Sequence, residues 1–257
     1  MTASARLDGI ENFRDFGGYK ARRGQLRAGR LFRSAQHTFA SDSDLEHLHA
    51  LNLAAIFDLR RPSERERRPS RRHPRFAGAV IEADGEYESD VRWEDFIRTS
   101  DHSAESFRGY LTEFYKTAPF APRHIELFTR YFATLAQADG AVLVHCAGGK
   151  DRTGMICALT HHLAGVSEDD MMADFLATNS HVRLDVIGPA WARDIGLECG
   201  REPKVENLVV AMSVEAGYLH AAFNAIRAQY GSLDSYLEKA LGVDDARRAA
   251  IEERILE

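Results

Sequence analysis

The chain lacks most features of secreted, membrane-embedded or nucleic-acid-binding proteins. Its 257 residues include 3 cysteines, an odd and small number that excludes a disulfide framework and is typical of a reducing compartment. No hydrophobic segment follows Met1 and no apolar run approaches the length of a membrane span, so we expect no signal peptide and no stable membrane insertion. The net charge of −6 argues against general nucleic-acid binding. We therefore expect a cytoplasmic protein.

A recognisable metal site and internal repeats are also missing. The histidines lack the spacing of metal ligands, and His161 and His162 are neighbours on a predicted helix, where adjacent side chains do not share a face. We expect no metal and no other cofactor. With 44% hydrophobic and 28% charged residues the composition is that of a globular protein, and the length fits a single domain over residues 1–257.

Predicted strands alternate with predicted helices along the first two thirds of the chain. Ser41 followed by Asp44 marks the capped start of one helix. The pattern predicts strands at 54–58, 76–81 and 141–145, helices at 41–53, 103–116, 122–137 and 152–164, and mainly helical segments over 168–257. Such alternation predicts an α/β fold with a helical C-terminal part.

Residues 145–154 form the most informative segment, His-Cys-Ala-Gly-Gly-Lys-Asp-Arg-Thr-Gly, which we call the phosphate loop. Cys146 precedes Arg152 by six positions, and the loop lies between an apolar strand and a helix. A strand, a tight loop and a helix N-terminus together form an anion-binding cradle. A thiolate at the base of such a cradle is a nucleophile directed at phosphorus, so the segment predicts a cysteine-dependent phosphatase.

Each residue type in the phosphate loop suits this chemistry. The helix N-terminus and the loop cations are expected to stabilise the Cys146 thiolate, and the Arg152 guanidinium matches two phosphoryl oxygens. Gly148 and Gly149 are expected to adopt positive φ and allow close approach. The phosphate would be bound by the backbone and side chains of Ala147, Gly148, Gly149, Lys150, Asp151 and Arg152.

Two loop residues have alternative interpretations. Thr153 can donate a hydrogen bond to the Cys146 sulfur or be an ordinary residue of the first helical turn. His145 can support the loop backbone or act as the base of a Cys–His pair. Adjacent residues of a strand point to opposite faces, so we expect His145 to support the loop.

A general acid must protonate the leaving group, and three aspartates are candidates. Asp151 lies inside the loop and is the first candidate. Asp84 follows the predicted strand 76–81, and its loop could approach the site. Asp58 ends the predicted strand 54–58, and parallel strands end at the same edge of a sheet.

The loop resembles the signature of the atypical bacterial tyrosine and phosphoinositide phosphatases, which include secreted virulence phosphatases of mycobacteria and Listeria. The resemblance extends over nearly the whole chain. It includes residues 12–15 and 17–19, Gly29-Arg30-Leu31-Phe32-Arg33-Ser34, Asp58-Leu59-Arg60, and the tail segments 218–219, 230–233 and 236–237. One departure is Ala147-Gly148-Gly149, where the family more often has a bulkier residue followed by Ala-Gly.

The resemblance implies a central, mostly parallel sheet, a phosphocysteine intermediate, no metal and Asp151 as general acid. Lys150 resembles the lysine of loops that accept highly charged phosphoinositides. Members of this family are exported without an obvious signal, and part of the family has a mobile helical lid, for which residues 84–122 are the matching segment here.

Residues 60–75 contain eight arginines. They either steer anionic substrates or an acidic membrane surface towards the protein, or form a solvated face paired with acids. Arg60 itself follows the predicted strand 54–58, close to the edge of the sheet where the phosphate loop is expected to begin, and is a candidate phosphate contact. Cys157, one helical turn beyond Arg152, is expected to be a small core residue rather than a redox partner.

The sequence thus predicts a metal-independent phosphatase that acts through Cys146, with phosphotyrosine proteins as the first substrate class, phosphoinositides as the second, and inorganic phosphate bound in the loop. Two alternatives remain at this point: a phosphate-binding pseudoenzyme and a rhodanese-like sulfurtransferase. A Cys–His hydrolase is disfavoured by the expected direction of His145.

Overall fold

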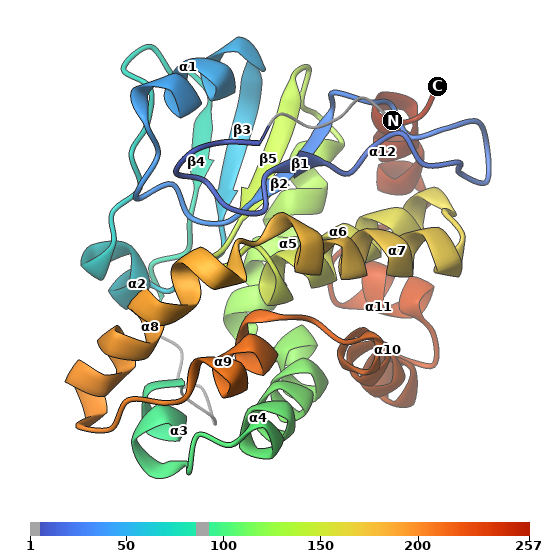
Figure 1. Ribbon diagram of the computed structural model, residues 1–257. Helices are drawn as coiled ribbons and strands as arrows, with labels where there is room; N and C mark the ends of the chain where they lie inside the picture. The colour runs from blue at the N-terminus through green and yellow to red at the C-terminus, as the bar shows by residue number, and fades with distance from the viewer. Residues whose placement is uncertain (1–5, 86–92) are drawn as a thin grey trace.

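A five-stranded mixed sheet forms the centre of the computed structural model, which describes residues 6–85 and 93–257 (Figure 1). The strand order is β1-β2-β5-β3-β4; β1 is antiparallel to β2 and all other neighbours are parallel. The strands are β1 (Arg14–Asp15), β2 (Leu31–Ser34), β3 (Leu53–Asp58), β4 (Ala79–Ile81) and β5 (Ala141–His145). The predicted α/β class with a mostly parallel sheet is confirmed, whereas β1 and β2 were not predicted.

Helices surround the sheet and form most of the C-terminal part, as predicted. Among the described residues, no single helix is long and apolar enough to cross a membrane. One bent pair, α9 (Val205–Met212) with α10 (Ala216–Tyr230), has the length and apolar composition of a membrane span when its two helices are taken together. The helices are α1 (Asp42–Ala50), α2 (Pro62–Arg67), α3 (Trp93–Thr99), α4 (Ala104–Thr117), a 3-10 turn (Ala118–Phe120), α5 (Pro122–Leu135), α6 (Asp151–Ala164), α7 (Glu168–His181), α8 (Leu184–Cys199), α9 (Val205–Met212), α10 (Ala216–Tyr230), α11 (Leu233–Lys239) and α12 (Asp245–Ile255).

Local signals explain where α1 begins and ends. The Asp44 N–H donates to the Ser41 hydroxyl at 3.1 Å, and the Ser41 N–H donates to the Asp44 carboxylate at 2.9 Å, which completes the predicted capping box. The helix ends at Ala50, earlier than predicted, because Asn52 adopts a left-handed conformation with φ of 50°. The chain can then turn directly into β3.

Both faces of the sheet are buried, and residues of β3 and β5 alternate between them. Ile56 and Leu143 pack with Leu45 of α1 on one face. Phe57 and Val144 belong to the larger core on the other face, which includes residues of α5 and α6. This two-sided burial accounts for the continuous apolar sequence of β5. The phosphate loop is therefore anchored to the most enclosed strand of the sheet.

A third apolar cluster joins the helices α3, α4, α8 and α9. Phe107, Ile195 and Leu208 are buried in it, and aromatic rings from three of these helices surround them. Figure 1 shows these helices grouped at one end of the molecule, well away from α1. Helix α4 also contacts α10 and so connects this cluster to the main core.

Candidate active site

Three parallel strands bring polar residues to one edge of the sheet. The register pairs Ser34 at the end of β2 with His145 at the end of β5, and His145 with Asp58 at the end of β3. The phosphate loop begins at this edge and leads into α6, whose first residue is Asp151. The predicted strand, loop and helix N-terminus are thus present at the edge where open α/β sheets bind ligands.

The carbonyl groups of the phosphate loop are held from outside the loop. The Gln36 N–H donates to the Ala147 carbonyl at 3.1 Å. The side-chain amide of Asn12 donates to the next two carbonyls at 3.3 and 2.7 Å, and Arg33 Nη2 also donates to the second of these, that of Gly149, at 2.9 Å. Within a peptide unit the C=O and the N–H point in opposite directions, so the N–H groups that follow these carbonyls face the interior. These N–H groups are the candidate donors of the predicted anion cradle.

Only one of the two loop glycines has a left-handed backbone. Gly149 has a φ of +64°, and a Cβ placed there would lie 2.3 Å from the Ser34 carbonyl oxygen. Gly148 is not among the residues with positive φ, and a Cβ there would meet only the Lys150 side chain at 3.5 Å. The predicted positive φ is confirmed for Gly149 and wrong for Gly148, because the close approach occurs only where the loop passes β2.

A buried ion cluster fixes the donors that hold the loop. Asp174 of α7 binds Arg14 at 3.1 Å and Arg33 at 2.6 Å, with all three side chains at most 5% exposed. Arg14 also donates to the side-chain oxygen of Asn12. Burial alone would raise the pKa of Asp174, but the two guanidinium groups hold it well below its usual value. The carboxylate therefore stays ionised and keeps both arginines in place.

Arg152 is near enough to Cys146 to interact with it electrostatically and is oriented by Glu64 of α2. Cys146 is buried, with 2% of its surface exposed. Arg152 donates through Nη1 and Nη2 to the two Glu64 oxygens at 2.7 and 2.8 Å, and through Nη1 to the Leu59 carbonyl at 3.2 Å. Burial opposes the ionised form of Glu64, but the Arg152 charge outweighs it and lowers the pKa of Glu64 to about 2.

The contact with Glu64 leaves one side of the Arg152 guanidinium free. No hydrogen bond from Nε is found among the described residues, and Nη2 uses only one of its two hydrogens. The Nε and Nη2 donors form the second fork of a guanidinium, and a phosphoryl group can accept from both. Glu64 thus occupies one edge of Arg152 and presents the other.

Lys150 and Asp151 form an ion pair at the start of α6. The Lys150 Nζ lies 2.9 and 3.0 Å from the two Asp151 oxygens, and 3.4 Å from the Ser213 carbonyl. The Tyr115 hydroxyl of α4 donates to Asp151 Oδ1 at 2.9 Å. The Asp151 side chain is 18% exposed, so a carboxylate is available at the mouth of the loop.

His145 packs against side chains outside the phosphate loop. Its ring stacks on His37 at 4.5 Å, and its Nε2 lies 3.6 Å from Asp58. Burial lowers the pKa of His145 to about 4, so the imidazole is neutral at physiological pH. Its Nδ1 lies 3.3 Å from the carbonyl oxygen of Cys146, a position suited to the predicted support of the loop backbone.

Asp58 and Arg60 form a buried pair. Arg60 donates to the Asp58 carboxylate at 2.6 to 3.1 Å, and its other donors bind Gln36, Arg68 and Ser70. Arg60 has no donor left for a phosphate oxygen, which argues against the predicted phosphate contact. Burial disfavours the charge on Asp58, yet nearby His145 and Arg60 lower its pKa, so it is poorly suited to be a general acid.

Asp84 is held at the surface. Its side chain is 88% exposed and pairs with Arg65 of α2 at 2.5 Å. This position argues against its predicted role as general acid. The segment proposed as a lid, 84–122, contains α3 and α4, while its residues 86–92 lie outside the described residues.

Thr153 and Cys157 are both buried in α6. The Thr153 hydroxyl has no hydrogen-bond partner among the described residues. Of its two interpretations, an ordinary residue of the first helical turn fits this arrangement, and a bond to the Cys146 sulfur does not. Cys157 lies in the main core, where burial raises the pKa of its thiol to about 12. The prediction of a small core residue is confirmed for Cys157.

The arginine-rich segment 60–75 is largely neutralised by ion pairs. Arg61 binds Glu94 of α3 at 2.9 Å, and Arg68 binds Asp194 of α8 at 2.8 Å. Further pairs join Arg65, Arg71 and Arg75 to Glu82, Asp84, Asp42 and Glu46. Most of this segment therefore fits the interpretation of a face whose arginines are paired with acids. Several of the acidic partners belong to distant elements rather than to the same helix.

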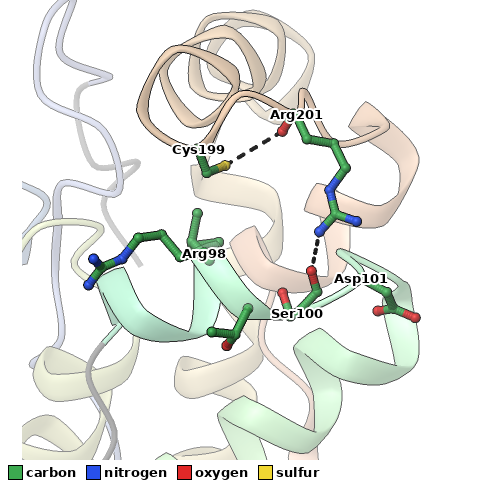
Figure 2. A pocket seen from close by; sticks show the side chains of 7 residues that line it. Arg98, Ser100, Asp101, Cys199 and Arg201 are labelled. Atoms are coloured by element: carbon green, nitrogen blue, oxygen red, sulfur yellow. Dashed lines mark hydrogen bonds between the residues drawn. The ribbon is translucent and has the colours of Figure 1, made fainter.

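A cavity of about 320 Å³ lies between the C-terminal ends of α3 and α8, apart from the phosphate loop (Figure 2). Figure 2 shows the Arg201 guanidinium donating to the Ser100 carbonyl and the Cys199 thiol facing the Arg201 carbonyl at 3.6 Å. The thiol also donates to the Ile195 carbonyl at 2.9 Å. These donors are satisfied within the protein. Within residues 6–85 and 93–257, no group of three or more His, Cys, Asp or Glu side chains could hold a metal ion.

Sequence reasoning missed Glu64 and Tyr115 as residues of the site. Glu64 occupies the third position of α2, which begins four residues after the end of β3, and this position is only a weak indication of a role in the site. Tyr115 gave no signal, because a tyrosine on an amphipathic helix is usually a core residue. Asn12 and Arg33 were noted only as parts of motifs that resemble the family's.

The comparisons with known proteins agree with this site. The family model described as "Tyrosine phosphatase family" matches residues 5–257. A protein of Cupriavidus necator that bears the name "Putative tyrosine-protein phosphatase" is 36% identical over 94% of this chain and 85% of its own. The triple specificity protein phosphatase PtpB of Mycobacterium tuberculosis is 29% identical over 95% of this chain and 96% of its own. A tyrosine-protein phosphatase of Nostoc commune is 28% identical over 85% and 71%, respectively.

This agreement extends over nearly the full length and includes the phosphate loop with Cys146 at its base. A thiolate in such a cradle is the nucleophile that cysteine-based phosphatases use. The chain therefore belongs to the tyrosine phosphatase family and is a cysteine-based phosphatase.

Proposed function

We propose that the protein hydrolyses phosphate monoesters without a metal ion, through a phosphocysteine on Cys146. In the first step the sulfur attacks phosphorus, the ester P–O bond breaks, and the proton of the Asp151 carboxyl passes to the leaving oxygen. In the second step water attacks the phosphocysteine and returns a proton to Asp151. The S–P bond breaks, and inorganic phosphate leaves the loop.

The observation that carries this proposal is the set of donors around Cys146. The outward-held carbonyls turn the loop N–H groups inward, and Glu64 leaves the Nε–Nη2 edge of Arg152 free. A trigonal phosphoryl group between sulfur and a leaving oxygen has three equatorial oxygens that need such donors. Preformed donors require no reorganisation during the reaction, so they favour the transition state.

Phosphotyrosine proteins are the substrate class that we propose first. Cys146 is only 2% exposed, so a phosphoryl group must enter to the base of the loop to reach it. A phosphate carried on a long aryl side chain reaches that depth more readily than one on a short seryl side chain. Phosphoinositides are the second class, because Lys150 adds a cation to a loop that already contains Arg152. The name of the mycobacterial relative, a triple specificity phosphatase, is in line with more than one class.

The test is phosphate release from phosphotyrosine peptides, phosphoserine peptides and phosphoinositides in the presence of EDTA, with Cys146→Ser as control. We expect turnover that EDTA does not reduce, that the serine variant lacks, and that is fastest on phosphotyrosine. Turnover that EDTA abolishes, or that Cys146→Ser retains, would overturn the mechanism. Faster turnover of phosphoserine peptides would overturn the substrate assignment alone.

A further inference from the structure

One buried hydroxyl outside the phosphate loop contacts the proposed general acid. The Tyr115 side chain is fully buried on α4, and its hydroxyl donates to Asp151 Oδ1 at 2.9 Å. Burial raises the pKa of Tyr115 well above its usual value, so the hydroxyl keeps its proton and remains a donor. Asp151 Oδ2 has no such hydroxyl contact among the described residues, whereas the Lys150 ammonium lies close to both oxygens, at 3.0 Å from Oδ1 and 2.9 Å from Oδ2.

We propose that Tyr115 is a positioning residue, which fixes Asp151 Oδ1 so that Oδ2 delivers the proton to the leaving group. The inference rests on the proposed function, in which Asp151 is the general acid. The hydrogen bond from Tyr115 favours Oδ1 as the carbonyl oxygen of the protonated carboxyl group, which leaves the proton on Oδ2 once Lys150 has turned to the incoming phosphate. In the first step that proton moves from Oδ2 to the leaving oxygen as the P–O bond breaks and the S–P bond forms. In the second step water returns a proton to Oδ2.

The surroundings of Tyr115 make it a rigid anchor. Its ring stacks on Tyr218 at 5.5 Å and meets the edges of Phe175 at 6.1 Å and Phe114 at 5.7 Å. Rings from three helices thus fix its rotamer, which is what a group must have to orient another group precisely enough for proton transfer. Lys150, by contrast, has a flexible side chain and can turn from Asp151 to an incoming phosphate.

The neighbouring Tyr218 provides a matched control. It is 3% exposed and lies in the same ring stack, but its hydroxyl has no hydrogen-bond partner among the described residues. Tyr218→Phe therefore removes the same atom from the same cluster without touching Asp151. Thermal unfolding of both variants shows whether either substitution disturbs the fold.

The experiment measures kcat/KM for aryl phosphates whose leaving groups differ in acidity, because kcat/KM reports the first step, whereas kcat also contains the hydrolysis of the phosphocysteine, which is the same for every substrate. General acid catalysis matters most for a poor leaving group such as phenol, which resembles tyrosine with a pKa of about 10, and least for an acidic one such as 4-nitrophenol. We expect Tyr115→Phe to lower kcat/KM for phenyl phosphate about tenfold, the value of one hydrogen bond to a charged group, and less than about twofold for 4-nitrophenyl phosphate. Tyr218→Phe should leave both rates unchanged.

Asp151→Asn and the double variant separate this inference from the proposed function. If Tyr115 acts through Asp151, Tyr115→Phe adds no further loss in the Asp151→Asn background. An equal loss of kcat/KM on both substrates in Tyr115→Phe, or losses that add in the double variant, would overturn the positioning role. If Asp151→Asn itself leaves the dependence on the leaving group unchanged, the proposed general acid fails rather than the role of Tyr115 alone.

Discussion

Glu64→Gln provides a direct test of how Arg152 is oriented. Glutamine retains the side-chain oxygen that caps α2 through the Arg61 N–H, at 2.7 Å in the wild type, so the helix is preserved. It replaces one of the two acceptors that hold Arg152 at 2.7 and 2.8 Å with an amide donor. A hydrogen bond to a charged group is worth roughly 1.5–3 kcal/mol. Losing one therefore reduces the free energy that holds Arg152 in its orientation by at least about 1.5 kcal/mol.

That loss corresponds to about a tenfold lower kcat, because 1.36 kcal/mol is a factor of ten. KM should not rise, since removing the Glu64 charge leaves Arg152 more attractive to the dianionic substrate. The assay is steady-state kinetics on 4-nitrophenyl phosphate together with inhibition by inorganic phosphate. Glu66→Gln, an exposed residue of the same helix, is the matched control and should behave as wild type. A Glu64→Gln enzyme with unchanged kcat, or with the whole effect in KM, would refute this reasoning.

Three further predictions concern stability. Gly149→Ala should lower the free energy of unfolding by at least about 1–2 kcal/mol in urea, because its φ is +64° and its Cβ would lie 2.3 Å from a carbonyl oxygen, whereas Gly148→Ala should be tolerated. Asp174→Asn should cost about 3–5 kcal/mol in the same assay, because it leaves two buried arginines without their counter-ion; a loss below 1 kcal/mol would contradict the account. The pKa of His145 in the folded protein is about 4, below the ordinary 6.5. The unfolded chain therefore takes up a proton first as the pH drops, and the free energy of unfolding should fall between about pH 6.5 and 4. His145→Gln should flatten that part of the profile, and an unchanged slope would contradict the assignment.

Local signals predicted the sheet centre and the loop. The apolar run of β5, the glycines after it and the helical pattern that follows are continuous in sequence, so no distant residue was needed to place Cys146 and Arg152 together. The capping pair Ser41 and Asp44 likewise lies within one turn. β2 was missed because it contains Arg33, which is fully buried against Asp174 of α7, and no periodicity rule expects an arginine in the core.

The residues that prepare the site are those that sequence could not place. Glu64 and Arg152 are 88 positions apart, and Tyr115 and Asp151 are 36 apart, so both contacts exist only in the folded chain. Arg60 shows the converse. Its position just after β3 suggested a phosphate contact, but Asp58, two residues earlier, holds its guanidinium inside the protein. A position near an edge therefore does not decide which side of it a long side chain faces.

The central claim is that phosphate passes through the Cys146 sulfur, and trapping the intermediate tests it most directly. Wild-type enzyme is mixed with radiolabelled phosphotyrosine peptide, quenched with acid within milliseconds, digested and analysed by mass spectrometry. We predict a phosphoryl group on the peptide that contains Cys146, at up to one per enzyme, and none on Cys146→Ser. Full turnover with no label on that peptide at any quench time, or label on another residue, would contradict the mechanism.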